Sequence, residues 1–232
     1  MKHLLTIYLP IMIIGSWFSY SCRRAPEKIS YDTSSCMPAH HKDKVSTFRA
    51  EPIIPGKIIF LGNSLTEMGP WRSLLEDSSV INRGIGGDVS FSILARLDDI
   101  TVRKPSKLFI MAGINDLSKG IPESVIAGNY LKIIQELRKE SPSTELYIQS
   151  VLPVNPLISN FPSAYNKSRE IQSLNGLLTK LSADQQIKYV NLYPLFIDPW
   201  GNLKEEYTTD GLHLGFKGYE VWVSYLKKEK YL

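Results

Sequence analysis

The chain has 232 residues, of which 43% are hydrophobic and 22% are charged, and this composition suits one compact domain with a sizeable core plus an appendage. Its formal net charge of +4 comes from basic residues that are scattered among acidic ones, so no clustered basic face for nucleic acid is expected. Two cysteines are too few for a zinc site of the usual kind.

Residues 1–21 have the pattern of a secretion signal. Lys2 supplies a positive charge, an apolar stretch runs from Leu4 to Phe18 with Pro10 inside it, and small residues follow. The apolar stretch is too short for a comfortable membrane span, so we interpret residues 1–21 as a signal peptide and leave them out of the fold. The protein is therefore expected to be exported.

The cleavage site allows two interpretations. Small residues at Ser19 and Ser21 suit an ordinary signal peptidase, whereas Cys22 directly after them resembles the lipidated cysteine of a bacterial lipoprotein, although Ser19 stands where leucine is usual. We favour a lipid anchor at Cys22, because a polar tether after it suits an anchored periplasmic or outer-surface enzyme. In the other interpretation Cys22 could form a disulfide with Cys36 in an oxidising compartment.

Residues 22–52 contain three prolines and no clear hydrophobic period, so they are expected to be a tether and an irregular lead-in. His40 and His41 in this stretch are interpreted as a surface pair without a function. The folded domain is expected to span residues 53–232.

From residue 57 onward, apolar runs typical of buried strands alternate with stretches of helical length. Strands are expected at 57–61, 79–82, 107–112, 145–151 and 188–191, and helices at 66–77, 88–99, 122–140, 164–183 and 216–229. Strands separated by helices of this length indicate right-handed βαβ crossovers and a parallel sheet of about five strands covered on both faces. The expected fold is therefore a three-layer α/β/α domain.

Ser64 lies where the first of these strands runs through a tight turn at Gly62 into a helix. Ligands of an open α/β sheet bind beyond the carboxyl ends of its strands, and a helix N-terminus there offers free N–H groups to negative charge. Serine is also a common helix cap, so this position alone does not decide its role.

Two more stretches follow predicted strands. The loop Asn82–Asp88 is rich in glycine, which allows a tight turn with outward-facing N–H groups, but it lacks the spacing of a dinucleotide-binding loop. Asn115 in Ala112–Asp116 can point its side-chain amide into the same crevice, although asparagine is also common in ordinary turns.

Asp210 and His213 lie three residues apart near the C-terminus, close enough for their side chains to hydrogen-bond. A helix-capping aspartate beside a surface histidine is the ordinary alternative. Together with Ser64 and Asn115, they would supply the hydroxyl, base, acid and anion-stabilising groups of acyl-transfer chemistry. Thr66 stands where a G-x-S-x-G elbow would have its second glycine, which argues against the α/β-hydrolase family.

At these residues the sequence resembles the SGNH, or GDSL-type, hydrolase family, and within it the branch that includes the catalytic subunits of platelet-activating-factor acetylhydrolase. The resemblance covers about 52–230. Its four motif blocks occur in the family's order: Gly62-Asn63-Ser64-Leu65, Gly86-Gly87-Asp88, Gly113-Ile114-Asn115-Asp116 and Asp210-Gly211-Leu212-His213. It implies a flavodoxin-like parallel five-stranded sheet.

The resemblance also implies roles for these residues. Ser64 would be the nucleophile, His213 the general base and Asp210 the residue that orients that base. The oxyanion hole would be formed by the backbone N–H groups of Ser64 and Gly87 and by the side chain of Asn115. Asn63 replaces the aspartate that is usual in the family signature, and its amide keeps an acceptor oxygen of similar shape.

We therefore expect an exported serine esterase that cleaves small acyl esters through an acyl-enzyme, with no cofactor or metal. Family analogy and the export signal favour O-acetyl groups on carbohydrates. The connection from Leu152 to Ser163, rich in proline, is expected to form a rigid rim suited to the alcohol half of a substrate. An acyltransferase acting on a sugar hydroxyl and a non-catalytic carbohydrate-binding module remain open; the latter would normally lack Ser64, Asn115 or His213, and all three are present.

Overall fold

The structure is a computed structural model that describes residues 37–158, 161–164 and 166–232. These residues belong to a unit that runs from Asp32 to Leu232. The expected signal peptide, Cys22 and Cys36 lie outside the described residues, so the interpretations of residues 1–36 stay predictions. Among the helices of the described ranges, none is both long enough and apolar enough to cross a bilayer.

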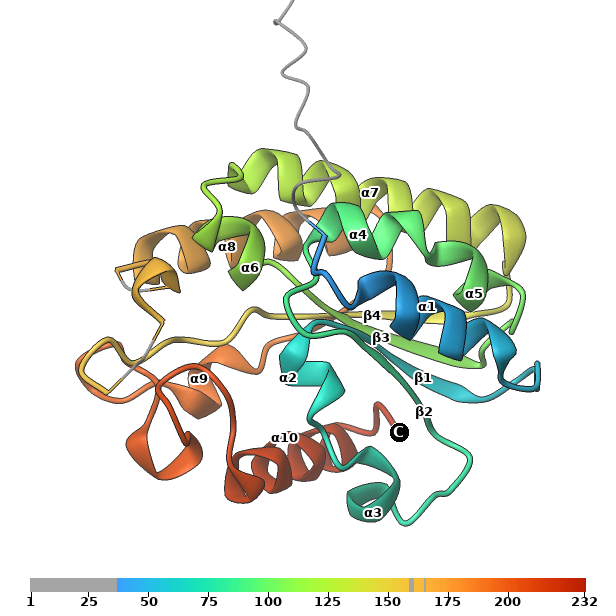
Figure 1. Cartoon of the computed structure of the whole chain (residues 1–232). Helices are drawn as coiled ribbons and strands as arrows, with labels where there is room; N and C mark the ends of the chain where they lie inside the picture. The colour runs from blue at the N-terminus through green and yellow to red at the C-terminus, as the bar shows by residue number, and fades with distance from the viewer. Residues whose placement is uncertain (1–36, 159–160, 165) are drawn as a thin grey trace, which may run out of the picture. The chain divides into compact units, whose positions relative to one another are not determined.

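A central sheet of five parallel strands organises the domain (Figure 1). The strands are β1 (Ile58–Gly62), β2 (Ile81–Gly84), β3 (Lys107–Met111), β4 (Glu145–Gln149) and β5 (Lys188–Val190), and they lie in the order β2-β1-β3-β4-β5. This is the flavodoxin-like order, in which the direction of winding reverses between β1 and β3. It confirms the predicted fold class.

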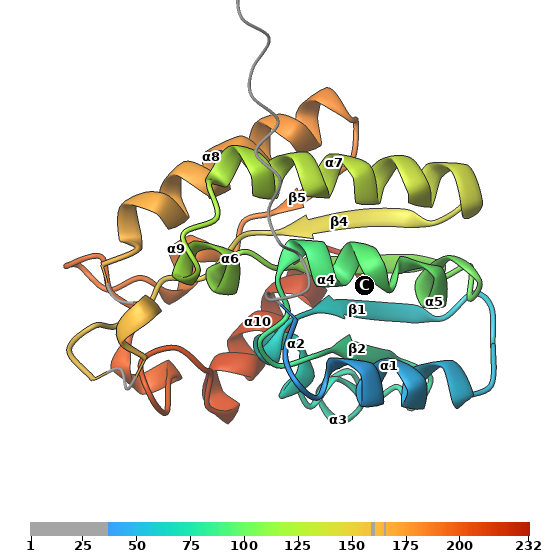
Figure 2. The same cartoon turned by 45° about the horizontal axis from the view of Figure 1, so that its top comes forward.

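Helices form the two outer layers. They are α1 (His41–Ala50), α2 (Ser64–Glu67), α3 (Trp71–Leu75), α4 (Ser90–Ala95), α5 (Leu97–Thr101), α6 (Ile114–Ser118), α7 (Glu123–Glu140), α8 (Ser168–Asp184), α9 (Tyr193–Phe196) and α10 (Phe216–Lys228). Helices α4, α5, α7 and α8 pack on one face of the sheet, and α3, α9 and α10 pack on the other (Figures 1 and 2). The three predicted layers are therefore present.

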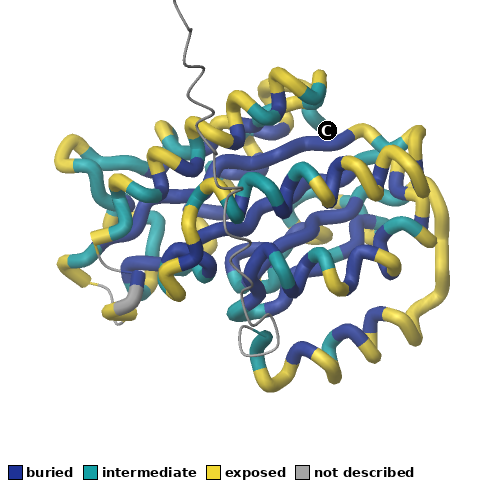
Figure 3. Tube along the Cα trace, turned by 90° about the horizontal axis from the view of Figure 1, so that it is seen from above, coloured by how far each residue is buried: buried dark blue, intermediate teal, exposed yellow. Residues whose placement is uncertain are grey.

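The two faces of the sheet have different cores, because successive side chains of a strand point in opposite directions. Ile59 and Leu61 face an aliphatic layer beneath α4, α7 and α8, whereas Phe60 faces an aromatic layer. The Phe60 ring stacks on Trp71 at 4.1 Å and on Phe109 at 4.9 Å between ring centroids. Such pairs contribute about 0.5–1.5 kcal/mol each beyond the area that they bury, and they fix the strand that leads to Ser64. Figure 3 shows the central strands buried along most of their length between partly exposed helices.

The lead-in before the domain is not irregular throughout, as the sequence had suggested. Residues 41–50 form α1, and His41, Val45 and Phe48 lie buried on one face of it, spaced four and three residues apart. Only two of these three are apolar, so the sequence shows too little amphipathic pattern to indicate a helix. The interpretation of His41 as a surface residue was wrong, because only 5% of it is exposed.

Two predicted helices are each divided. The stretch predicted at 66–77 forms α2 and α3 with Pro70 as the cap between them, since proline has no N–H to continue the first helix. The stretch predicted at 88–99 forms α4 and α5, which meet at Arg96, and this side chain is buried. The short helices α6 and α9 were not predicted.

Candidate active site

Ser64 is the first residue of α2, directly beyond the carboxyl end of β1. The helix cap is Asn63, whose side-chain oxygen accepts a hydrogen bond from the N–H of Leu65 at 3.1 Å. The acceptor role expected for the Asn63 side chain is thus confirmed. Because Asn63 caps the helix, the Ser64 hydroxyl is available for another partner.

That partner is His213. The Ser64 Oγ lies 2.9 Å from Nε2 of His213, and Nδ1 of the same ring lies 2.7 Å from Oδ2 of Asp210. Since a carboxylate can only accept, Nδ1 carries the proton that is donated to Asp210, which leaves Nε2 to accept from the serine hydroxyl. The three side chains therefore form one directed chain of hydrogen bonds, the arrangement that a histidine base needs.

The loop that carries Asp210 and His213 is internally fixed. The second carboxylate oxygen of Asp210 accepts from the N–H groups of Leu212 at 3.0 Å and His213 at 2.7 Å. Partial burial favours a higher pKa for Asp210, but hydrogen bonds from the His213 ring and from these N–H groups outweigh it and hold the pKa below the ordinary value. Asp210 is therefore charged and can orient the imidazole at neutral pH.

The glycine-rich loop after β2 lies against Ser64. A Cβ built on Gly86 would come within 3.8 Å of the Ser64 Cβ. Gly87 has a φ of 79°, in the left-handed region that favours glycine, and a Cβ there would meet Cγ of Pro38 at 2.9 Å. Both its backbone conformation and its close neighbour thus require glycine at position 87.

Asn115 lies in the first turn of α6, after β3, and its Nδ2 donates to the main-chain oxygen of Asp88 at 2.9 Å. An amide nitrogen has two N–H groups, so this bond fixes the side chain and leaves one donor for a ligand. Asn115 and Gly87 line the same pocket, which has a volume of about 470 Å³. The structure therefore brings together the Ser64, Gly87, Asn115 and His213 regions that the sequence predicted to converge.

The lining of this pocket combines apolar side chains with a few polar groups. It consists of Met37, Pro38, Gly87, Asn115, Ser118, Lys119, Phe161, Ala164 and Leu212. The Phe161 ring packs edge-on against the His213 ring, with 5.3 Å between the ring centroids, so the pocket adjoins the histidine. Met37 and Pro38 were not predicted as lining residues, because they come from the lead-in.

A buried network supports Asn115 from behind. The carboxylate of its neighbour Asp116 accepts hydrogen bonds from the N–H and the hydroxyl of Ser90, and the Ser90 hydroxyl accepts from Asn129. Burial raises the pKa of Asp116 to about 6, against the lowering effect of the Ser90 hydrogen bonds. This network joins the start of α6 to the start of α4, and it was not predicted because its members lie far apart in the chain.

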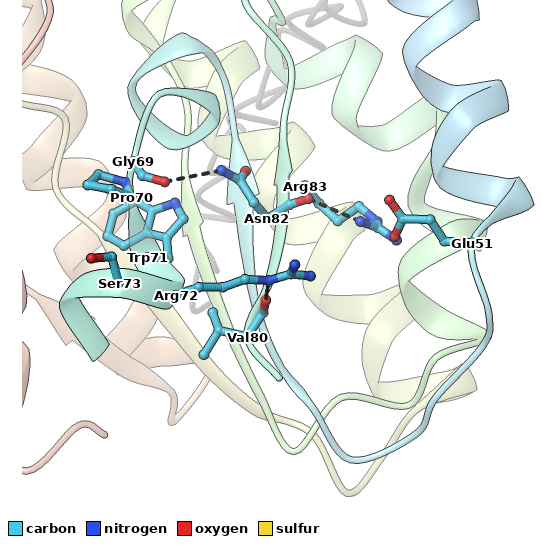
Figure 4. Close-up of a pocket in the computed structure, with 9 residues that line it drawn as sticks. All are labelled: Glu51, Gly69, Pro70, Trp71, Arg72, Ser73, Val80, Asn82 and Arg83. Atoms are coloured by element: carbon cyan, nitrogen blue, oxygen red, sulfur yellow. Dashed lines mark hydrogen bonds and ion pairs between the residues drawn. The ribbon is translucent and has the colours of Figure 1, made fainter. Parts of the chain in front are cut away.

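A second pocket, of about 440 Å³, lies at the β2 edge of the sheet (Figure 4). Two arginines contribute to it, and both have partners: Arg83 binds Glu51 at 2.6 Å, and Nε of Arg72 donates to the main-chain oxygen of Val80. None of the predicted site residues lines it. The described residues also contain no group of three or more His, Cys, Asp or Glu side chains that could hold a metal ion.

A doubly wound parallel sheet that carries this set of residues at its carboxyl edge defines an SGNH-type hydrolase. The chain belongs to the GDSL-like lipase/acylhydrolase family, whose model matches residues 60–221. This confirms the family that the sequence motifs indicated, and the chain is a serine esterase of this type.

Relatives and solved structures agree with this assignment. The chain is 24% identical to platelet-activating factor acetylhydrolase IB subunit alpha1 of Homo sapiens over 193 residues, which cover 79% of this chain and 77% of the relative. It is 31% identical to an arylesterase of Vibrio mimicus over 172 residues, which cover 68% of this chain and 79% of the relative. A GDSL-like lipase from Bacteroides thetaiotaomicron matches with a TM-score of 0.71 at 25% identity, covering 83% of this chain and 98% of that structure.

Proposed function

We propose that the protein is an exported esterase that removes small acyl groups, above all O-acetyl groups, through a Ser64–His213–Asp210 triad. The observation that carries the proposal is the pair of hydrogen bonds at 2.9 Å and 2.7 Å that joins these three side chains. They lie beyond β1, beside the point where the winding of the sheet reverses, which is where ligands of such sheets bind.

The geometry supports a two-step reaction. Nε2 of His213 takes the proton of the Ser64 hydroxyl as Oγ attacks the ester carbonyl carbon. The carbonyl oxygen becomes an oxyanion, and the N–H groups of Ser64 and Gly87 and the remaining amide N–H of Asn115 bind it. When the carbon–oxygen bond of the ester breaks, His213 returns its proton to the leaving alcohol, and Ser64 holds the acyl group.

The acyl-enzyme is then hydrolysed by the same groups. His213 takes a proton from water, the hydroxide attacks the acyl carbon, and the bond to Ser64 breaks with return of the proton to Oγ. Asp210 keeps the imidazole in the required tautomer and stabilises its charged form in both steps. In both steps, His213 takes up the proton that leaves Ser64 or water and then passes it on.

Several features support a small acyl group on a carbohydrate. The name of the human relative states an acetylhydrolase activity. The pocket next to Asn115 has apolar side chains together with the hydroxyl of Ser118 and the ammonium of Lys119, a combination that suits a sugar ring with apolar faces and hydroxyl edges. The pattern of residues 1–22 supports export, either to the periplasm or to the outer surface with a lipid anchor at Cys22.

The test is a Ser64→Ala variant assayed with 4-nitrophenyl acetate and with O-acetylated sugars. It should lose its esterase activity and its labelling by a fluorophosphonate, while its thermal unfolding stays that of the wild type. Ser224→Ala, on α10, is the matched control and should keep both. A folded Ser64→Ala protein with nearly full activity would exclude the triad, and transfer of the acetyl group to added sugars would show an acyltransferase instead.

A further inference from the structure

A segment outside the family motifs lies against the oxyanion side of the site. We call residues 37–50, which include α1, the N-terminal strap, and residues 85–88 the oxyanion loop. The strap runs along the β2 edge of the sheet (Figures 1 and 2). There the Arg83 guanidinium lies over the Phe48 ring, 4.4 Å from the ring centroid. At its other end it reaches the oxyanion loop.

The strap supports three successive residues of that loop. The N–H of Gly86 donates to Glu67 at 2.6 Å, and the other carboxylate oxygen of Glu67 binds Lys44 of the strap at 2.6 Å. Gly87 lies directly against Pro38. The carboxylate of the next residue, Asp88, binds Nδ1 of His41 at 2.8 Å.

Asp88 is the centre of this arrangement, and it is fully buried. One of its carboxylate oxygens binds His41 of the strap, and the other accepts from Nε of Arg96 at 2.9 Å. Its main-chain oxygen accepts the amide N–H of Asn115. The position of the Asn115 donor therefore depends on Asp88, and the position of Asp88 depends on the strap from one side and on Arg96 from the other.

The strap does not need His41 to stay attached to the domain. Arg103 donates to the main-chain oxygens of Phe48 at 2.6 Å and Pro52 at 2.8 Å. Glu51, directly after α1, binds Arg83 at 2.6 Å, and the two side chains face each other in Figure 4. Removal of the His41 ring should therefore weaken one end of the strap, which keeps its contacts through Lys44 and Pro38, while the other end stays in place.

We propose that the N-terminal strap holds the oxyanion loop in its catalytic position and that His41 is the positioning residue through which it acts. The proposal rests on the esterase function proposed above. His41 does not touch the substrate; it acts through Asp88 on Gly87 and Asn115. A displacement of such donors by about 1 Å can lower a rate by up to about 10²-fold, so a partial loss of support should lower kcat about tenfold.

The first experiment compares His41→Ala, His41→Asn and Arg49→Ala in the full chain, with 4-nitrophenyl acetate as substrate. The concentration of active sites is measured by titration with a fluorophosphonate, so that unfolded protein is not counted when kcat is calculated. His41→Ala should lower kcat about tenfold with KM changed less than about twofold, because the oxyanion forms only after the substrate has bound. His41→Asn should recover most of the loss, since its amide can donate to Asp88. Arg49→Ala, which breaks an exposed ion pair of the same helix with Asp98, is the control and should behave as the wild type.

A second experiment separates positioning from general stability. In an Asn115→Ala background, one donor that Asp88 positions is already absent, so His41→Ala should lower kcat by less than about threefold. Lys44→Met breaks the partly exposed contact with Glu67, with little risk to folding, and should lower kcat about two- to threefold. Equal factors for His41→Ala in both backgrounds would show that it does not act through Asn115.

The outcomes also separate this proposal from the proposed function. If Ser64→Ala is inactive while the His41 and Lys44 variants have the kcat of the wild type, the strap has no role in catalysis and the esterase function stands. If His41→Asn is as slow as His41→Ala although both are folded, the hydrogen bond to Asp88 is not the cause of the loss. If Ser64→Ala remains active, the proposed esterase function is wrong, and the role proposed for the strap, which rests on it, is wrong as well.

Discussion

The buried carboxyl group of Asp116 should make the stability of the protein depend on pH in a direction opposite to that of most acidic groups. Its carboxylate is fully buried and accepts hydrogen bonds from Ser90, and among the described residues it forms no salt bridge with a cationic side chain. Burial raises its pKa from the ordinary value of 3.8 to about 6. The folded protein therefore binds a proton more tightly at this position than the unfolded chain does.

The sign and the size of the effect follow from this difference. Because the pKa is higher in the folded chain, the stability that Asp116 contributes is fully present below pH 3.8 and is lost as the pH rises through about 6. The two values differ by about two units, and each unit corresponds to about 1.36 kcal/mol, which gives about 3 kcal/mol in total. Asp116→Asn, which cannot be charged, should lack this loss.

The assay is the free energy of unfolding in urea for the wild type and Asp116→Asn between pH 4 and pH 7. The stability of the variant relative to the wild type should rise by about 2 kcal/mol between pH 4 and pH 7, because part of the total is already lost at pH 4. This rise is independent of what the variant loses at every pH through altered hydrogen bonds to Ser90. Asp98→Asn, on the exposed side of α5, controls for the removal of one carboxylate. Parallel curves for the wild type and Asp116→Asn would refute the argument that charging the buried carboxyl costs stability.

Three further predictions concern the site, the anchor and the substrate. Asn115→Ala should lower kcat by about 10²–10³ with little change in KM, as expected for one oxyanion donor, and an unchanged kcat would remove Asn115 from the site. If Cys22 is lipidated, Cys22→Ala should release the protein from membranes, whereas a soluble wild type with a Cys22–Cys36 disulfide would favour ordinary secretion. In a series of 4-nitrophenyl esters, acetyl and propionyl esters should have a higher kcat/KM than octanoyl or longer ones, because most connections between the elements are short and leave little chain for a deep acyl tunnel; a steady rise toward long chains would indicate a lipase.

The strands could be predicted because each is a short apolar run between turn residues. What the sequence does not reveal is which core each side chain enters. Both faces of the sheet are covered, so Ile59 and Phe60 look alike as apolar residues, although one joins an aliphatic layer and the other an aromatic one. The stacking of Phe60, Phe109 and Tyr147 depends on the register of three strands, which no local pattern specifies.

The site residues were predictable for a similar reason, since each motif block is local and follows a strand or precedes a helix. The residues that support them were not. His41 has a role only because it meets Asp88, which lies 47 positions further along the chain, and α1 itself has only Val45 and Phe48 as buried apolar residues. Arg96 likewise appears as an ordinary charged residue of a predicted helix, and Asp116 as the last residue of a motif block with no role of its own, until the fold buries them.

The order of the strands explains why motifs from distant parts of the chain meet. Because β1 lies between β2 and β3, the segments that follow these three strands are neighbours, and they carry Ser64, Gly87 and Asn115. The fourth motif does not follow a neighbouring strand and needs other contacts.

These contacts come from both sides of the loop that carries His213. The N–H of Asn155, beyond β4, donates to the main-chain oxygen of Gly211 at 2.7 Å, and the Tyr219 hydroxyl of α10 donates to the main-chain oxygen of Leu65 at 2.8 Å. The first bond fixes the loop that carries Asp210 and His213 to the segment beyond β4. The second bond fixes α10, which follows this loop, to α2, the helix of Ser64. These two hydrogen bonds, which the order of the strands alone would not provide, help to set the distance between Ser64 and His213. The nucleophile and its base are therefore positioned by separate parts of the fold.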